Sequence, residues 1–128
     1  MTVSVIEQRF DEIVKQGIVV LDFWASWRGP CRAFAPEFEA AAERHPDVVF
    51  GKVDTEAEAG LAAAFEIRAN PTLMVVRDGV VLSAFPGAMQ LDDLIEKVRA
   101  IDMNEVRRKL EEAQPKEPTG VAEKKGAA

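Results

Sequence analysis

The stretch IVVLDFWASWRGPC, residues 18–31, sets the framework of this chain because it joins a buried strand to the start of a helix. Residues 18–24 are apolar except for Asp22, a pattern typical of a strand covered on both faces. Pro30 suits the first turn of a helix, and apolar residues at helical spacing follow it to about residue 44. The stretch therefore predicts a central strand that leads into a helix bearing the chain's single cysteine, Cys31.

The rest of the chain alternates strand and helix patterns around this unit. Apolar residues at helical spacing predict helices, and continuous apolar or β-branched runs predict strands. The predicted helices cover residues 4–16, 56–65 and 91–101, and the predicted strands cover residues 48–54, 72–77 and 80–85. The sequence leaves open a short strand before the first of these helices. Only Asp78-Gly79 separates the last two strands, which is a strong hairpin signal. The order favours an α/β fold in which an antiparallel pair follows a parallel unit.

The C-terminal part of the sequence differs from the rest. With 128 residues and 48% hydrophobic content, the chain is long enough for one domain, which we place over residues 1–101. Asp102 begins a pattern that resembles a capping box, so a separate helix is predicted over residues 102–114. Residues 115–128 have almost nothing to bury, and we expect them to be disordered.

Charge and composition exclude several function classes. The net charge of −6 and the pI near 4.9 give no field that attracts nucleic acid or anionic lipid. The N-terminus lacks the pattern of a signal peptide, and no apolar run approaches the roughly 18 residues of a membrane span. Together with the single cysteine, this predicts a cytoplasmic protein. His45 is the only histidine, so no metal site is expected, and we expect it to meet a helix end or solvent.

Several motifs, in order over residues 2–101, resemble those of the thioredoxin family. They are Asp22-Phe23-Trp24-Ala25, Trp27, Gly29-Pro30-Cys31, Pro36, Lys52-Val53-Asp54, Asn70-Pro71-Thr72 and Gly87. The residues around Cys31 and Glu56 are most similar to those of actinobacterial thioredoxins. The resemblance implies a thioredoxin fold, with a central mixed five-stranded sheet in the order 1-3-2-4-5 and helices on both faces.

One departure from the family pattern affects the chemistry directly. The resemblance implies that a cysteine normally stands at Arg28 and attacks the target disulfide, and that the cysteine matching Cys31 resolves the mixed disulfide. Exchange needs an attacking thiolate, which arginine cannot supply, and the chain has no other cysteine. Protein-disulfide reductase activity, the family's activity, is therefore expected to be impaired. The sequence leaves open whether Arg28 is natural or engineered, and whether Cys31 is reactive or an inert core residue.

The resemblance also assigns roles to residues around the thiol. It implies that Asp22 is a buried carboxylate that accepts a proton, which fits the cost of burying a charge in an apolar strand. Lys52 is either a surface lysine or the family's lysine near that carboxylate. Pro71 corresponds to the family's cis-proline, and Asn70 stands where an aliphatic residue or threonine is usual. The expected substrate groove consists of Trp27, Gly29, Pro30, Asn70, Pro71 and Gly87.

Three kinds of function are compatible with these residues. The first is a protein of the cytoplasmic thiol–disulfide system that retains one thiol and the groove. The second is a redox-inert module that binds an extended peptide by backbone pairing. The third is an ordinary reductase whose attacking cysteine was replaced. The expected partners are proteins with disulfides or extended segments, and thioredoxin reductase; we expect a monomer without a cofactor.

Overall fold

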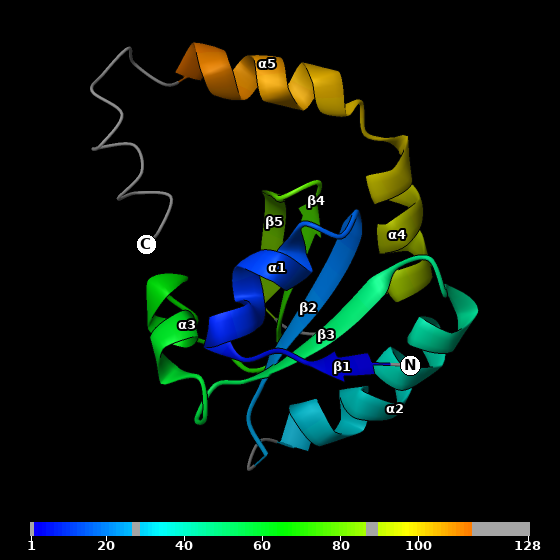
Figure 1. Ribbon diagram of the computed structural model, residues 1–128. Coiled ribbons are helices and arrows are strands. Elements are labelled where there is room, and N and C mark those ends of the chain that lie inside the picture. The colour runs from blue at the N-terminus through cyan, green and yellow to red at the C-terminus, as the bar shows by residue number, and fades with distance from the viewer. Residues whose placement is uncertain (1, 27–28, 87–89, 114–128) are drawn as a thin grey trace. The chain divides into compact units, whose positions relative to one another are not determined.

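A five-stranded mixed sheet forms the centre of the computed structural model, which describes residues 2–26, 29–86 and 90–113 (Figure 1). The strand order is β1-β3-β2-β4-β5, as predicted. The strands are β1 (Thr2–Ser4), β2 (Ile18–Trp24), β3 (Val49–Asp54), β4 (Thr72–Arg77) and β5 (Val80–Pro86). Strands β1, β3 and β2 run parallel, whereas β4 is antiparallel to both β2 and β5. The long continuous apolar run therefore lies in the middle of the sheet.

The helices between these strands are shorter at two places than the sequence predicts. The helices of this part of the chain are the 3-10 helix η1 (Glu7–Arg9), α1 (Phe10–Val14), α2 (Gly29–Arg44), α3 (Ala59–Ala64) and, after the last strand, α4 (Leu91–Ala100). The helix predicted over residues 4–16 was wrong at its start, because the edge strand pairs with β3 and the backbone N–H of Val5 donates to Lys52. The helix predicted over residues 56–65 begins late, because the Asp54 carboxylate accepts the N–H groups of Glu56 and Ala57 in a turn.

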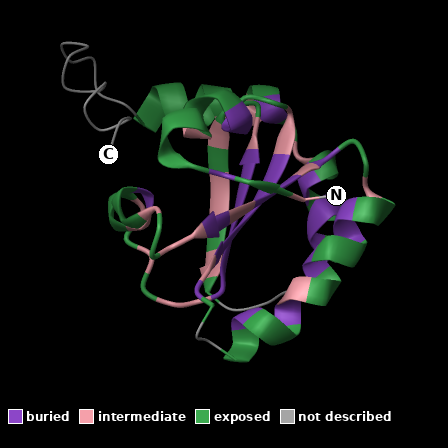
Figure 2. Cartoon of the chain, turned by 60° about the horizontal axis from the view of Figure 1, so that its bottom comes forward, coloured by how far each residue is buried: buried purple, intermediate pink, exposed green. Residues whose placement is uncertain are grey.

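The two faces of the sheet bury two different apolar clusters. On one face, Val20 of β2 and Phe50 of β3 pack with residues of α2 and α4. On the other face, Val19 and Leu21 of β2 pack with residues of α1 and α3. Figure 2 shows β2 almost entirely buried, in contrast to the more exposed edge strand β5. The alternation of side chains along β2 thus decides which helices each residue meets.

The hairpin between β4 and β5 follows the expected turn chemistry. Asp78 and Gly79 have φ angles of 53° and 81°, so both lie in the left-handed region. Two such residues are what a two-residue hairpin loop of the favoured hand requires. The short dipeptide therefore accounts for the antiparallel direction of the last strand.

The C-terminal end of α2 is tied to the N-terminal end of α4 by polar contacts. The Asp92 carboxylate accepts hydrogen bonds from the Arg44 guanidinium, and its Oδ1 lies 2.7 Å from Nε2 of His45. The hydrogen bond from His45, together with Arg44, holds the pKa of Asp92 below its usual value. The expectation that His45 meets only a helix end or solvent was wrong, because the fold brings a carboxylate of another helix to it.

The chain from Arg99 onward forms a second unit. Helix α5 (Met103–Ala113) follows Asp102, whose carboxylate accepts the backbone N–H groups of Asn104 and Glu105. This is the cap that the sequence predicts. The tail predicted over residues 115–128 lies outside the described residues. Within the described parts of the chain, no helix is long and apolar enough to cross a membrane.

Gly51 in β3 leaves room for two side chains that pack over it, one from β2 and one from the residue that follows β1. A Cβ atom at this position would lie 2.6 Å from Cγ2 of Val5 and 2.9 Å from Cδ2 of Leu21. Both neighbours are buried, so neither side chain has free space into which it can move. The absence of a side chain at Gly51 is therefore a packing requirement.

We predict that Gly51→Ala lowers the free energy of unfolding by about 1 to 3 kcal/mol, the usual cost of overfilling a packed core. The measurement is chemical denaturation followed by circular dichroism. Gly29→Ala is the control, because a Cβ atom there meets nothing within 4 Å. Equal stability of the Gly51→Ala protein and the parent would contradict the packing argument.

Candidate thiol site

Strand register places the polar residues of the site on one face of the sheet. Asp22 of β2 pairs with Lys52 of β3, and both are an even number of residues from the Val20–Phe50 pair. Because side chains alternate along a strand, Asp22 and Lys52 project toward the face that α2 covers. Trp24 has the same parity. The alternation of side chains along β2 thus places the Asp22 carboxylate and the Trp24 indole on the face covered by the helix that carries Cys31.

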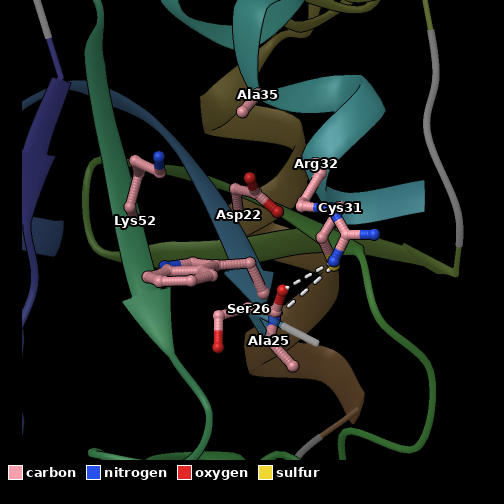
Figure 3. Close-up of a pocket in the computed structure, with 8 residues that line it drawn as sticks. Asp22, Ala25, Ser26, Cys31, Arg32, Ala35 and Lys52 are labelled. Atoms are coloured by element: carbon pink, nitrogen blue, oxygen red, sulfur yellow. Dashed lines mark hydrogen bonds between the residues drawn. The ribbon is translucent and has the colours of Figure 1, made fainter. Parts of the chain in front are cut away.

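These side chains line a small pocket at the start of α2, with a volume of about 170 Å³ (Figure 3). Its walls come from the end of β2 and the following loop, from the first turns of α2, and from β3. The lining residues are Asp22, Trp24, Ala25, Ser26, Cys31, Arg32, Ala35 and Lys52. The pocket therefore brings together three residues predicted for the site, namely Asp22, Cys31 and Lys52.

Asp22 is buried without full hydrogen bonding. Its residue is only 1% exposed, and its Oδ1 atom has no hydrogen-bond partner. Burial raises the pKa of Asp22 from 3.8 to about 6, and the positive charge of Lys52 opposes part of that rise. A carboxyl group with this pKa is mostly ionised at neutral pH and can still be protonated readily, which suits proton exchange.

Lys52 lies near both the carboxylate and an aromatic ring. Its Nζ atom is 5.4 Å from the centre of the Trp24 ring, within range of a cation–π interaction. Figure 3 draws the lysine and Asp22 on neighbouring strands of the pocket wall. Of the two interpretations of Lys52, the position agrees with the one that puts it near the buried carboxylate, where it acts on the pKa of Asp22.

Cys31 lies in the first turns of α2, with only 4% of its surface exposed. The backbone N–H of Ala25 donates to its Sγ atom over 3.5 Å. Nearby, the Arg32 guanidinium donates to the backbone carbonyl of Ser26 over 3.1 Å, which ties the loop to the helix. The thiol is thus shielded from bulk solvent but borders the pocket.

The expected groove is described only in part. The Asn70–Pro71 peptide bond is cis, as the resemblance implied. Pro71 is buried, and Oδ1 of Asn70 is a buried acceptor that has no hydrogen-bond partner. Gly29 and Pro30 are exposed at the start of α2. Trp27, Arg28 and Gly87, which were also predicted for the site, lie outside the described residues.

Five of the lining residues were not predicted for the site: Trp24 and Ala25, which the sequence offered only as part of a family motif, and Ser26, Arg32 and Ala35. Ser26 and Arg32 flank the loop, and Ala35 lies one helical turn after Cys31. The spacing of four residues between Cys31 and Ala35 could have placed Ala35 on the same face of the helix. Nothing in the sequence indicates the bond between Arg32 and the Ser26 carbonyl. Over the described ranges, no group of three or more histidine, cysteine or acidic side chains is placed to hold a metal ion.

Comparison with known proteins agrees with this fold. The sequence model of the family described as Thioredoxin matches residues 1–100, and the chain belongs to the thioredoxin family. "Putative thioredoxin 2" of Streptomyces coelicolor is 50% identical over 117 residues, which span 88% of this chain and 87% of that protein. Thioredoxin C-3 of Corynebacterium nephridii is 39% identical over 90 residues, which span 69% of this chain and 62% of that protein.

Solved structures give the same result for the fold. Thioredoxin F from spinach chloroplast superposes with a TM-score of 0.68 at 38% identity, over 77% of this chain and 92% of that one. Plasmodium falciparum thioredoxin superposes with a TM-score of 0.69 at 32% identity, over 76% and 98% of the two chains. The protein is therefore a thioredoxin-family redox protein with one cysteine, which is consistent with an incomplete active site.

We predict that Asp22→Asn stabilises the protein above pH 6. The raised pKa means that folding opposes ionisation of Asp22, so the penalty on its ionised form is absent below pH 3.8 and complete above pH 6. The gain at pH 8 is at most about 3 kcal/mol, reduced by any hydrogen bond that the buried amide fails to make. Chemical denaturation of both proteins at pH 4 and pH 8 measures the difference.

Glu37→Gln, an equal change of charge on an exposed residue of α2, is the control and should show no such pH dependence. A stability of Asp22→Asn at pH 8 equal to or below that of the parent would mean that the carboxylate is better compensated than its burial indicates.

Proposed function

We propose that this protein acts in the cytoplasmic thiol–disulfide system through a single thiol, Cys31, which forms mixed disulfides with low-molecular-weight thiols or protein cysteines. The observation that carries the proposal is that Cys31 and the buried Asp22, whose Oδ1 lacks a partner, line the same pocket. The carboxylate can accept the proton that the thiol loses on attack. The family membership supports this chemistry, although the full two-cysteine cycle is unavailable to a chain with one cysteine.

The finer assignment is an actinobacterial-type thioredoxin in which Arg28 replaces the attacking cysteine. The 50% identity to the Streptomyces protein over most of both chains supports the type. The position of Arg28 three residues before Cys31 supports the replacement. Thioredoxin reductase and proteins that carry disulfides are the proposed partners, and the chain is proposed to act as a monomer.

A second candidate is a peptide-binding module that uses no redox chemistry. The observation that favours it is the buried, unpartnered Oδ1 of Asn70, directly before the cis Pro71 bond. A buried acceptor without a hydrogen bond destabilises the protein, and a donor that reaches it removes this penalty. An N–H group of an extended segment in the groove is a suitable donor, and this role needs no cysteine.

The first test is intact-mass measurement after the protein has reached equilibrium with an excess of hydroxyethyl disulfide. We predict a mass gain of one mercaptoethanol group on the parent protein, because Cys31 borders a pocket that a small reagent can enter. Cys31→Ser is the control and should show no gain. If the native parent remains unmodified while the denatured chain is modified, the single-thiol proposal is wrong and the binding module is favoured.

The second test restores the missing thiol. We predict that Arg28→Cys reduces insulin disulfides when thioredoxin reductase supplies electrons, whereas the parent shows at most a trace of this activity, since a thiolate at this position is what exchange lacks. The double variant Arg28→Cys, Cys31→Ser is the control, because it contains an attacking but no resolving thiol. Failure of Arg28→Cys to reduce insulin would show that the groove or Asp22 no longer serves disulfide reduction.

A further inference from the structure

Cys31 is almost fully buried beside a small pocket. The residue is 4% exposed, and the pocket beside it has a volume of about 170 Å³. A cavity needs only about 10 to 15 Å³ of such volume to hold one water molecule, so the pocket has room for several small molecules. Thiol–disulfide exchange requires the attacking sulfur to reach a sulfur that carries a substituent, and its rate depends on that access. We therefore expect the buried sulfur of Cys31 to react more readily with a reagent close to water in size than with a larger disulfide.

A second observation points to a ligand in the same pocket. Asp22 lines this pocket and is only 1% exposed, yet its Oδ1 has no hydrogen-bond partner. An unpaired buried acceptor is costly and is satisfied by a small molecule that can donate a hydrogen bond. Hydrogen peroxide is such a donor, and it is also an oxidant of thiols. The thiol and the acceptor thus border one space that a peroxide molecule can enter (Figure 3).

We propose that this pocket admits hydrogen peroxide, which oxidises Cys31 to a sulfenic acid with Asp22 as proton acceptor, and that the sulfenic acid then condenses with a small thiol. This inference rests on the proposed function, since it gives the route by which the single thiol becomes a mixed disulfide. It removes the need for the attacking cysteine that the sequence lacks. Arg32 and Lys52 are the cationic residues among the lining, so the pocket is not lined by negative charge alone.

The two steps balance in atoms and electrons. In the first step the Asp22 carboxylate takes the proton of the thiol, the sulfur attacks one peroxide oxygen, and the O–O bond breaks as the S–O bond forms. The leaving hydroxide takes the proton back from Asp22 and departs as water, so the sulfur loses two electrons and the peroxide gains them. In the second step the sulfur of a free thiol displaces the sulfenic hydroxyl group, which leaves as water, and a disulfide forms.

The experiment compares two routes to the same adduct on the full chain. Protein is mixed either with hydrogen peroxide and mercaptoethanol or with hydroxyethyl disulfide at the same concentration, and intact mass is followed with time. We expect the peroxide route to give the mixed disulfide at least about tenfold faster. Dimedone, which traps sulfenic acids, should give one adduct on peroxide-treated parent protein and none on Cys31→Ser.

The role of Asp22 has its own readout in the pH profile of dimedone trapping. The rate for the parent should rise through an inflection near pH 6, where Asp22 ionises. Asp22→Asn should lose this inflection and react at least about tenfold more slowly at pH 7. Glu37→Gln, which removes an exposed carboxylate outside the pocket, should keep the profile of the parent. An unchanged profile in Asp22→Asn would overturn the assignment of Asp22.

The outcomes separate this inference from the proposed function. If hydroxyethyl disulfide modifies Cys31 as fast as peroxide with mercaptoethanol does, or if no dimedone adduct forms, the peroxide route is wrong while the single-thiol function stands. If neither route modifies native Cys31, both proposals are wrong. The parent protein alone decides these outcomes, so they do not depend on the folding of any variant.

Discussion

Burial of β2 on both faces is the constraint on which the rest of the structure depends. The strand pairs with β3 on one side and β4 on the other, and helices cover the sheet above and below it. Every side chain of its interior is removed from water, including that of Asp22. The apolar residues thereby supply most of the driving force for the fold, while the carboxylate takes on a pKa of about 6. The stability of the sheet and the chemistry of the pocket have the same origin.

Much of this arrangement could be predicted because local patterns and tertiary structure agree. The apolar run of β2 and the Asp78-Gly79 turn each have one favoured structure, and both appear where expected. The ends of the short helices could not be predicted, since strand pairing of β1 and the hydrogen bonds to the Asp54 carboxylate override helical spacing there. The strand order came from the resemblance to a family, because spacing alone does not determine which strands are neighbours.

Three residues of the site could be predicted from the sequence, but their arrangement in space could not. Asp22, Cys31 and Lys52 were expected from motifs, and the structure adds that they border one pocket. The unpartnered oxygen of Asp22 and the bond from Arg32 to the Ser26 carbonyl are tertiary features that no pattern in the sequence encodes. The core around the site is apolar and closely packed, whereas the departures from the family pattern at Arg28 and Asn70 fall on residues of the expected binding face. The fold is thus that of the family, and the two departures from the family's sequence pattern are not among the residues of its apolar core.

Proline at position 36 gives the two ends of α2 unequal mechanical support. Because Pro36 has no N–H group, the carbonyl of Arg32 cannot receive the usual bond from four residues ahead. The far end of the helix is anchored to α4 through Arg44, His45 and Asp92. The missing backbone bond would join the turn that carries Cys31 to the rest of α2. The thiol is therefore held by fewer helical hydrogen bonds than the residues at the far end of the same helix.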